Sequence, residues 1–176
     1  MRIETAESVT AGHPNKFCDL VSDLVLDECL KQDVASRVAC ETFATKALIV
    51  IGGEITSKAK IDYLSIVKIA AERVSYSLNN TDIRIAINEE SSDINDAVNQ
   101  AEQGAGDQGI MVGYATNESD DFLPIVVSFA RKITIRLDDL RKLGSLKGLG
   151  SDGKSQVSAA YARYVTKTII SGGLAE

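Results

Sequence analysis

The spacing of apolar residues in the first half of the sequence constrains the fold more than any other feature. Helical spacing predicts a helix from Pro14 or Asn15 to about Gln32, with an apolar side formed by Phe17, Val21, Leu24 and Val25. A continuous apolar run, Leu48-Ile49-Val50-Ile51, leads into Gly52-Gly53 and is typical of a buried strand. Such helices and strands must cover one another's apolar surfaces, so the chain is expected to form layers.

The same criteria predict the remaining elements. Strands are expected at 38–44 and 83–87, where apolar and polar residues alternate, and at 110–115. Helices are expected at about 64–78, from Phe122 to near Gly144, and from Ser158 to about Ser171. The predicted fold class is therefore α+β, with mixed β-sheet layers packed by long amphipathic helices on one face.

Residues 1–176 are expected to form one compact unit, because this length is usual for a single domain. Two loosely duplicated modules, 1–89 and 109–176, are the alternative, since both halves combine strands with long amphipathic helices. The connection between them, 90–108, has little apolar periodicity. A connection of that length in a compact domain is typical of a functional lid or of a disordered segment.

Charge and composition narrow the class of partner. A net charge of -6 and a pI near 4.9 argue against nucleic acid and against an anionic membrane surface. The start, MRIETAESV, has no leader pattern, and no apolar run approaches roughly 18 residues, so a cytoplasmic protein is expected. The odd number of cysteines, without metal-ligand spacing, predicts free and mostly buried thiols.

The only histidine, His13, stands just before Pro14 at the predicted start of the first helix. Unpaired backbone N–H groups and the helix dipole favour an anion there, and His13 with Lys16 could grip a phosphate chain. A histidine that only caps the helix is the alternative. The acidic residues Asp19, Asp23 and Asp27 follow at i, i+4 spacing, and such a stripe is usually a solvated face.

Four other carboxylates lie where a ligand or a cation could be met. Glu41 interrupts an apolar strand and Glu54 follows a Gly-Gly at a strand end. Both are equally compatible with hydrogen-bonded structural groups. Asp107 between glycines could be a turn residue, and Asp152-Gly153-Lys154 pairs an acid with a base but is weak evidence alone.

Several longer motifs together resemble the methionine adenosyltransferases, also called S-adenosylmethionine synthetases. The most specific match is EQGAGDQGIMVGYATNE (Glu102–Glu118). The others, in chain order, are ESVTAGHPNKFCDLVSDLVLD (Glu7–Asp27), SRVACET (Ser36–Thr42), GGEIT (Gly52–Thr56), SSDIND (Ser91–Asp96), DGKSQV (Asp152–Val157) and SAAYARYV (Ser158–Val165). They occur in the order usual for the family and cover nearly the whole chain.

The resemblance implies a reaction in which methionine sulfur attacks C5′ of ATP and displaces the triphosphate, which is then hydrolysed to phosphate and pyrophosphate. Alignment and charge stabilisation carry such a reaction, with help from Mg²⁺ and K⁺. It also implies a site shared between subunits, in a homodimer or a dimer of dimers. The resemblance implies His13 at the leaving oxygen and Lys154 on the triphosphate. It implies Asp107 and Asp152 around nucleoside and methionine, and Glu54 at the methionine end. It also implies Glu41 for potassium, and Glu90, Asp93 and Ile94 in a gating loop.

The sequence departs from the family pattern at three places. Asn15 stands where the family has an aspartate ligand of Mg²⁺, which predicts a weakened metal position. Glu90 stands where the family has a glutamine, and a carboxylate accepts but does not donate. The segments at Asp152–Val157 and Ser158–Val165 are adjacent here, whereas family members carry a long phosphate-binding insert between them and continue further at the end.

These departures leave two functions open beside each other. The first is a shortened methionine adenosyltransferase that forms S-adenosylmethionine. The second is a catalytically impaired relative that acts as an ATP- or methionine-binding or assembly subunit. A general ATP- or polyphosphate-binding module that does not use methionine is a third possibility.

Overall fold

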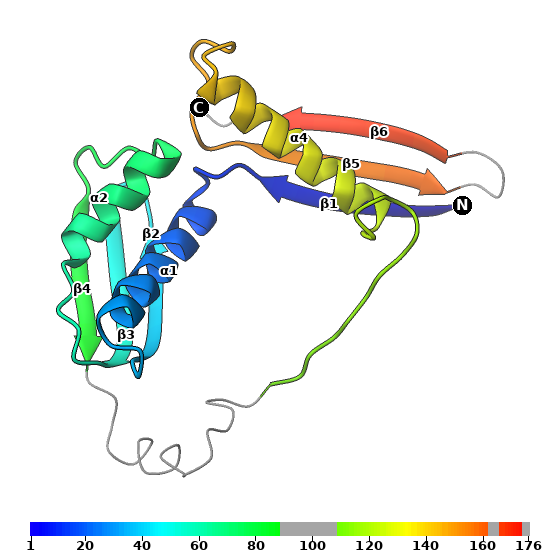
Figure 1. Cartoon of the computed structure of the whole chain (residues 1–176). Coiled ribbons are helices and arrows are strands. Elements are labelled where there is room, and N and C mark those ends of the chain that lie inside the picture. The colour runs from blue at the N-terminus through cyan, green and yellow to red at the C-terminus, as the bar shows by residue number, and fades with distance from the viewer. Residues whose placement is uncertain (89–108, 162–165, 174–176) are drawn as a thin grey trace. The chain divides into compact units, whose positions relative to one another are not determined.

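The computed structural model describes residues 1–88, 109–161 and 166–173, and the fold class is α+β as predicted (Figure 1). Contacts group the chain into two compact units, each assembled from separate stretches of sequence. One unit comprises 1–17, 71–77 and 114–176, and the other comprises 18–70 and 78–113. Each unit contains its own three-stranded sheet, so the predicted β-sheet layers are present.

The sheet of the second unit is mixed. It is formed by β2 (Arg37–Ala44), β3 (Leu48–Thr56) and β4 (Asp82–Asn88), in that order. The first pair is antiparallel and the second is parallel. Helices α1 (Pro14–Gln32) and α2 (Tyr63–Val74) lie over one face of this sheet (Figure 1). These elements confirm the helix, strand, strand, helix, strand order predicted for this half of the chain.

Burial explains why these residues form these elements. Ile49 and Ile51 of β3 are fully buried, and their alternation with β3 residues of the other face fits a sheet covered on one side. The buried side chains of the helices recur at helical spacing, at Val21, Val25 and Cys29 of α1 and at Ile66, Val67 and Ala70 of α2. A hydrogen bond of 2.9 Å between the hydroxyls of Ser22 and Thr42 ties α1 to β2.

The outer face of α1 is polar. Asp19, Asp23 and Asp27 are all exposed, which confirms the solvated stripe predicted from their spacing. None of the helices in the described part of the chain has the length and apolar composition that a bilayer span requires.

The first unit contains an antiparallel sheet in the order β1 (Arg2–Val9), β5 (Lys154–Tyr161) and β6 (Thr166–Gly173). Helix α4 (Ile125–Lys142) packs on this sheet, and its Val126 and Ala130 form a buried cluster with Val157 and Ala159 of β5. The predicted helix from Phe122 to near Gly144 is confirmed, with its start shifted to Ile125. Phe122 has a φ of +56°, which is incompatible with a helical residue.

The predicted helix from Ser158 to about Ser171 is wrong, because this segment forms the end of β5 and most of β6. Along β5 the buried residues are Ser155, Val157 and Ala159, so the apolar period is two and continues past Ser158. Pairing of all eight residues of β5 with β1 outweighs the helical preference of the alanine-rich stretch. The strand β1 itself was missed, since its inward positions carry small or polar side chains such as Ala6 and Ser8.

The predicted strand at Ile110–Ala115 is also wrong. These residues adopt no regular structure, and Ile110, Met111 and Val112 are almost fully exposed. Apolar side chains alone cannot make a strand, because the backbone also needs a partner for its hydrogen bonds.

The two modules predicted at 1–89 and 109–176 remain a prediction, since the connecting lid at 90–108 lies outside the described residues. The structure shows that β1, from the start of the chain, shares a sheet with β5 and β6 from its end. Segments that are distant in sequence therefore meet in the first unit.

The three cysteines are free, and Cys18 and Cys29 are buried, as the sequence predicted. Burial raises the pKa of the Cys40 thiol to about 11, with smaller contributions from Cys29 and Glu41. Burial also raises the pKa of Cys18 and of Cys29. Thiolates react with thiol reagents and thiols do not, so these side chains should be poorly reactive in the folded protein.

We expect the native protein at pH 8 to react with a chromogenic disulfide reagent at least about tenfold more slowly than free cysteine, because few thiolates form and access is restricted. In urea all three thiols should react at the rate of free cysteine. Rapid labelling of two or more thiols without denaturant would contradict the burial of Cys18 and Cys29.

Candidate functional site

The two motifs with the strongest predicted chemistry are in direct contact within the first unit. Val9 at the end of β1 pairs with Lys154 at the start of β5. Just beyond this pair, the Thr10 backbone N–H donates to the Gly153 carbonyl at 2.9 Å. The Thr10 hydroxyl accepts from the Gly153 N–H at 2.7 Å and donates to the Ser151 carbonyl at 2.7 Å. Thr10 is only 3% exposed, so the segments 10–16 and 151–154 are held together by a buried hydrogen-bonded joint.

A glycine makes this joint possible. A Cβ atom at Gly12 would lie 2.3 Å from the Cβ of Ser151 and 2.6 Å from its carbonyl oxygen. The turn before α1 can therefore approach Ser151 only without a side chain at position 12. The Ser151 hydroxyl in turn donates to the Ser75 carbonyl at 2.9 Å. Tyr76 follows Ser75 in the sequence, and its ring stacks on that of Phe17 with centroids 4.1 Å apart.

His13 forms the first hydrogen bonds of α1. Its carbonyl accepts from the Phe17 N–H at 2.9 Å, and its own N–H donates to the Thr10 carbonyl at 3.2 Å. The imidazole Nδ1 accepts from the Asn15 N–H at 3.2 Å. Since a neutral imidazole with an accepting Nδ1 carries its proton on Nε2, the hydrogen bond assigns His13 as a donor through Nε2. Pro14 fits the first helical position, where no N–H is needed.

Two lysines lie beside the joint. The Lys154 ammonium forms an ion pair with the Glu7 carboxylate, and Gln156 donates to the same carboxylate at 2.9 Å. The hydrogen bond from Lys154 holds the pKa of the Glu7 carboxyl below its usual value, so Glu7 is ionised at neutral pH. The Lys16 ammonium donates to the Val9 carbonyl at 2.7 Å. Both lysines are exposed, and an ammonium has three N–H donors, so each can contact a ligand while keeping these bonds.

The structure places the other predicted residues as follows. Asp152 is half-buried and stands between Ser151 and Gly153 of the joint, and Asn15 is exposed on the first turn of α1. Glu41 and Glu54 are exposed in the second unit, where their register partners are Gly52 and Ala39. They are diagonal neighbours on one face of the sheet. The remaining predicted residues, Glu90, Asp93, Ile94 and Asp107, lie outside the described residues.

Within the described residues, no group of three or more His, Cys, Asp or Glu side chains is arranged to hold a metal ion. Within the segments 10–16 and 151–154, the side-chain amide is that of Asn15 and the carboxylate is that of Asp152. Mg²⁺ is commonly held by one or two protein oxygens together with phosphates of the substrate. This donor set therefore fits a metal that arrives with a triphosphate better than a metal in a cage of side chains.

Three residues that build the site were missed in the sequence. Glu7 was recognised only as part of a motif, because its partners Lys154 and Gln156 lie on a strand whose pairing with β1 no local pattern reveals. Thr10 and Asp138 gave no signal, because their partners lie more than a hundred positions away in sequence. Asp138 on α4 accepts a hydrogen bond from the Ala11 N–H at 2.8 Å.

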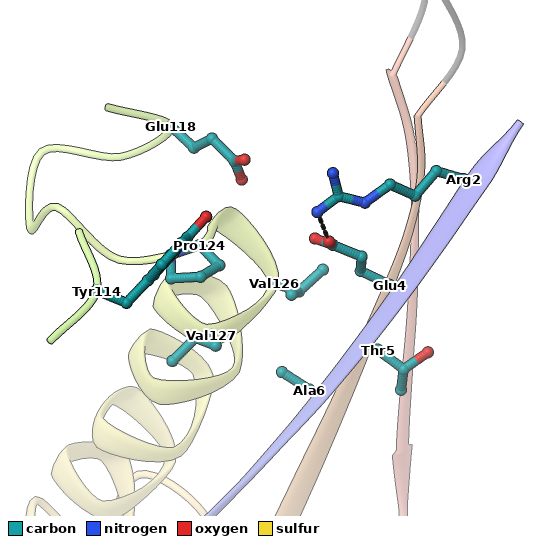
Figure 2. A pocket seen from close by; sticks show the side chains of 9 residues that line it. All are labelled: Arg2, Glu4, Thr5, Ala6, Tyr114, Glu118, Pro124, Val126 and Val127. Carbon is teal, nitrogen blue, oxygen red and sulfur yellow. Dashed lines mark hydrogen bonds and ion pairs between the residues drawn. The ribbon is translucent and has the colours of Figure 1, made fainter. Parts of the chain in front are cut away.

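A separate hollow of about 500 Å³ lies between β1 and the start of α4 (Figure 2). Its apolar wall includes Ala6, Val126 and Val127, and Tyr114 also lines it. Glu118 accepts hydrogen bonds from the Ile125 N–H at 3.1 Å and from the Tyr161 hydroxyl at 3.0 Å. None of the residues that line this hollow belongs to the joint, so it does not account for the predicted chemistry.

Comparison with known protein families identifies the family of the chain. Residues 1–102 match the model of the S-adenosylmethionine synthetase N-terminal domain, and residues 102–171 match that of the central domain. The chain belongs to the S-adenosylmethionine synthetase family. His13 lies in the part matched by the N-terminal domain and Lys154 in the part matched by the central domain. The Thr10–Gly153 joint thus connects the segment that matches the N-terminal domain with the segment that matches the central domain.

Several S-adenosylmethionine synthases are similar to this chain in sequence. S-adenosylmethionine synthase of Synechococcus sp. (strain CC9902) is 44% identical over 174 residues, which cover 89% of this chain and 43% of the relative. The protein of Brachyspira hyodysenteriae is 45% identical over 175 residues, covering 89% and 44%. That of Prochlorococcus marinus (strain AS9601) is 42% identical over 184 residues, covering 95% and 45%. The chain spans less than half the length of these S-adenosylmethionine synthases.

The approach of Gly12 to Ser151 can be tested by adding one methyl group. Gly12→Ala should destabilise the fold by about 1–3 kcal/mol, because the backbone carbonyl of Ser151 cannot move away as a flexible side chain could. Gly150→Ala is the matched control, since a Cβ there would meet nothing within 4 Å. Urea unfolding should give a lower midpoint for Gly12→Ala and little change for Gly150→Ala. Equal midpoints would show that the turn is looser than the structure indicates.

Proposed function

We propose that this chain carries out the methionine adenosyltransferase reaction, forming S-adenosylmethionine from ATP and L-methionine with release of phosphate and pyrophosphate. The observation that carries the proposal is the buried joint between Thr10, Ser151 and Gly153. It brings the only imidazole of the chain and two lysines to the start of one helix, in a member of the S-adenosylmethionine synthetase family.

The chemistry requires little of the protein at the nucleophile. The thioether sulfur of methionine attacks C5′ of ATP with its own lone pair, and the bond from C5′ to the triphosphate oxygen breaks. Negative charge then collects on the leaving oxygen. The Nε2–H of His13 is the donor that we assign to this oxygen, because Nδ1 is already occupied by the Asn15 N–H.

The lysines stabilise the rest of the leaving group. Lys154 is held at the start of β5 by Glu7, and Lys16 is held on α1 by the Val9 carbonyl. Fixed cations that need no rearrangement stabilise a departing polyphosphate most effectively. Helix α1 is 19 residues long, and the positive end of its dipole lies at its start, beside these cations.

Mg²⁺ and K⁺ are proposed as the metals because the chain belongs to this family and carries oxygen donors that could hold them. Asn15 and the triphosphate would hold Mg²⁺, which supplies neutralisation of phosphate charge, and Asn15 would do so weakly because its oxygen is neutral. Glu41 is proposed as a ligand of K⁺. Glu54, Asp107 and Asp152 are proposed to contact methionine or nucleoside, with Glu90, Asp93 and Ile94 in a loop over the site. A homodimer or dimer of dimers is the proposed assembly.

A second function is favoured by a specific observation. The Glu7 carboxylate already neutralises Lys154, and the chain spans less than half the length of its relatives. Both facts are compatible with a relative that binds ATP or methionine, or assembles with another subunit, without turnover. The two functions differ in whether product forms, so one assay separates them.

Incubation of the purified protein with ATP, L-methionine, Mg²⁺ and K⁺ should yield S-adenosylmethionine, detected by mass. His13→Ala and Lys154→Ala should each lower the rate by at least about 100-fold, as removal of one preorganised donor does in other enzymes. Lys147→Ala, which removes an exposed cation from the loop before β5, should stay within about twofold of the unchanged protein.

Product no greater than in His13→Ala would contradict the catalytic proposal. Calorimetric titration with ATP then decides between the alternatives. Binding that weakens in Lys154→Ala supports a binding subunit, and heat indistinguishable from buffer would leave the assembly role.

The Asn15 position can be restored to an acid. Asn15→Asp should raise the apparent affinity for Mg²⁺ by about threefold or more, because a carboxylate binds a hard dication better than an amide. Asn80→Asp, in an exposed turn, adds the same charge elsewhere and should leave the Mg²⁺ dependence unchanged. A Mg²⁺ titration of ATP binding measures both. Identical curves for Asn15→Asp and the unchanged protein would remove position 15 from the metal site.

A further inference from the structure

One ion pair on α4 is unusual because it is largely buried and yet leaves polar atoms without hydrogen-bond partners. Asp138 and Arg141 lie one turn apart on α4, and their side chains are only 12% and 11% exposed. The nearest approach, from Arg141 Nε to Asp138 Oδ1, is 3.6 Å, which is too long for a hydrogen bond. Among the described residues, Asp138 Oδ1 and Arg141 Nε and Nη2 are buried without a hydrogen-bond partner.

Stability of the helix does not explain this arrangement. Removing two charges from water costs free energy, and the attraction between them offsets that cost only where the geometry is close and the remaining polar atoms are satisfied. Here the geometry is open and three polar atoms are unsatisfied. Buried groups of this kind call for another explanation, and the contacts of the second carboxylate oxygen supply one.

That oxygen, Asp138 Oδ2, accepts the hydrogen bond from the Ala11 N–H at 2.8 Å. Ala11 is two positions before His13, in the turn between β1 and α1. Thr10 is fixed to Ser151 and Gly153, and His13 is fixed to Thr10 through its own N–H. Asp138 therefore restrains the turn from the side of α4, while the joint restrains it from the side of β5.

A carboxylate suits this task better than a neutral acceptor. Hydrogen bonds to a carboxylate are about twice as strong as those to a neutral acceptor. The open geometry of the pair leaves Oδ2 to the turn, where a closed bidentate pair would engage both oxygens.

We propose that Asp138, supported by Arg141, is a positioning residue that sets where the His13 imidazole stands at the start of α1. The proposal rests on the proposed role of His13 in holding a triphosphate. It adds a residue of α4 to the site, although Asp138 itself touches no reacting atom.

The test compares Asp138→Ala, Asp138→Asn and the control Asp139→Ala, which removes an exposed carboxylate from the next position of α4. Because the chain has one histidine, the imidazole gives a single set of proton resonances in NMR spectra. The second measurement is calorimetric titration with inorganic tripolyphosphate, and the third is the urea unfolding midpoint.

Asp138→Ala should shift or broaden the His13 resonances and weaken tripolyphosphate binding about tenfold, because the turn loses a charge-assisted hydrogen bond. Asp138→Asn keeps an acceptor oxygen, so it should cause a smaller shift of the same sign and an affinity loss of about threefold. Asp139→Ala should match the unchanged protein in both measurements.

Unchanged His13 resonances in Asp138→Ala, with only a lower unfolding midpoint, would overturn the proposal and leave Asp138 a structural residue. Where Asp138→Ala does not fold, unchanged resonances and affinity in Asp138→Asn overturn it equally. If the unchanged protein does not bind tripolyphosphate, the proposed function of the site fails, and the His13 resonances still decide whether Asp138 positions the imidazole.

Discussion

The candidate site depends on the antiparallel pairing of β1 with β5. This ladder brings Val9 opposite Lys154, and everything near the proposed chemistry follows from it. Thr10 can form its hydrogen bonds to Ser151 and Gly153 because the end of β1 lies beside the start of β5. Gly12 can approach Ser151 because it has no side chain. The turn so fixed begins α1 at a defined place, and the direction of the His13 imidazole is a consequence of that start.

The proposed residues divide between the two units. His13, Lys16, Asp152 and Lys154 all belong to the unit of β1, β5 and α4, whereas Glu41 and Glu54 stand on the sheet of the other unit. In the first group, Lys16, Lys154 and His13 provide what a polyphosphate requires, namely cations and a hydrogen-bond donor at a helix start. The second group is acidic and lies on an exposed sheet face, which suits a cation or an ammonium group.

Much of the fold could be predicted from local pattern, and the errors have identifiable causes. The helices at Pro14–Gln32 and Ile125–Lys142 and the strands β2, β3 and β4 were predicted because their apolar periods are clear. The end of the chain was assigned as a helix because an alanine-rich stretch favours one, whereas β1 provides a partner that no local pattern reveals. For the site, the motifs containing His13 and Lys154 were found in the sequence. Their contact, and the roles of Glu7 and Asp138, depend on pairs separated by 127 positions or more, which the sequence alone does not indicate.

The length of chain enclosed by the joint has a consequence for how the protein reaches its native state. Thr10 and Gly153 are separated by 143 positions, and the sheet of the first unit cannot form until residues beyond 154 are available. Contacts of such long sequence separation form slowly, because a large loop must close before they contribute stability. The β2–β3 hairpin, joined by a short turn, closes a far smaller loop. During synthesis the second unit can therefore begin to fold before β5, the partner strand of β1, has been made. The candidate site for the triphosphate is then completed last.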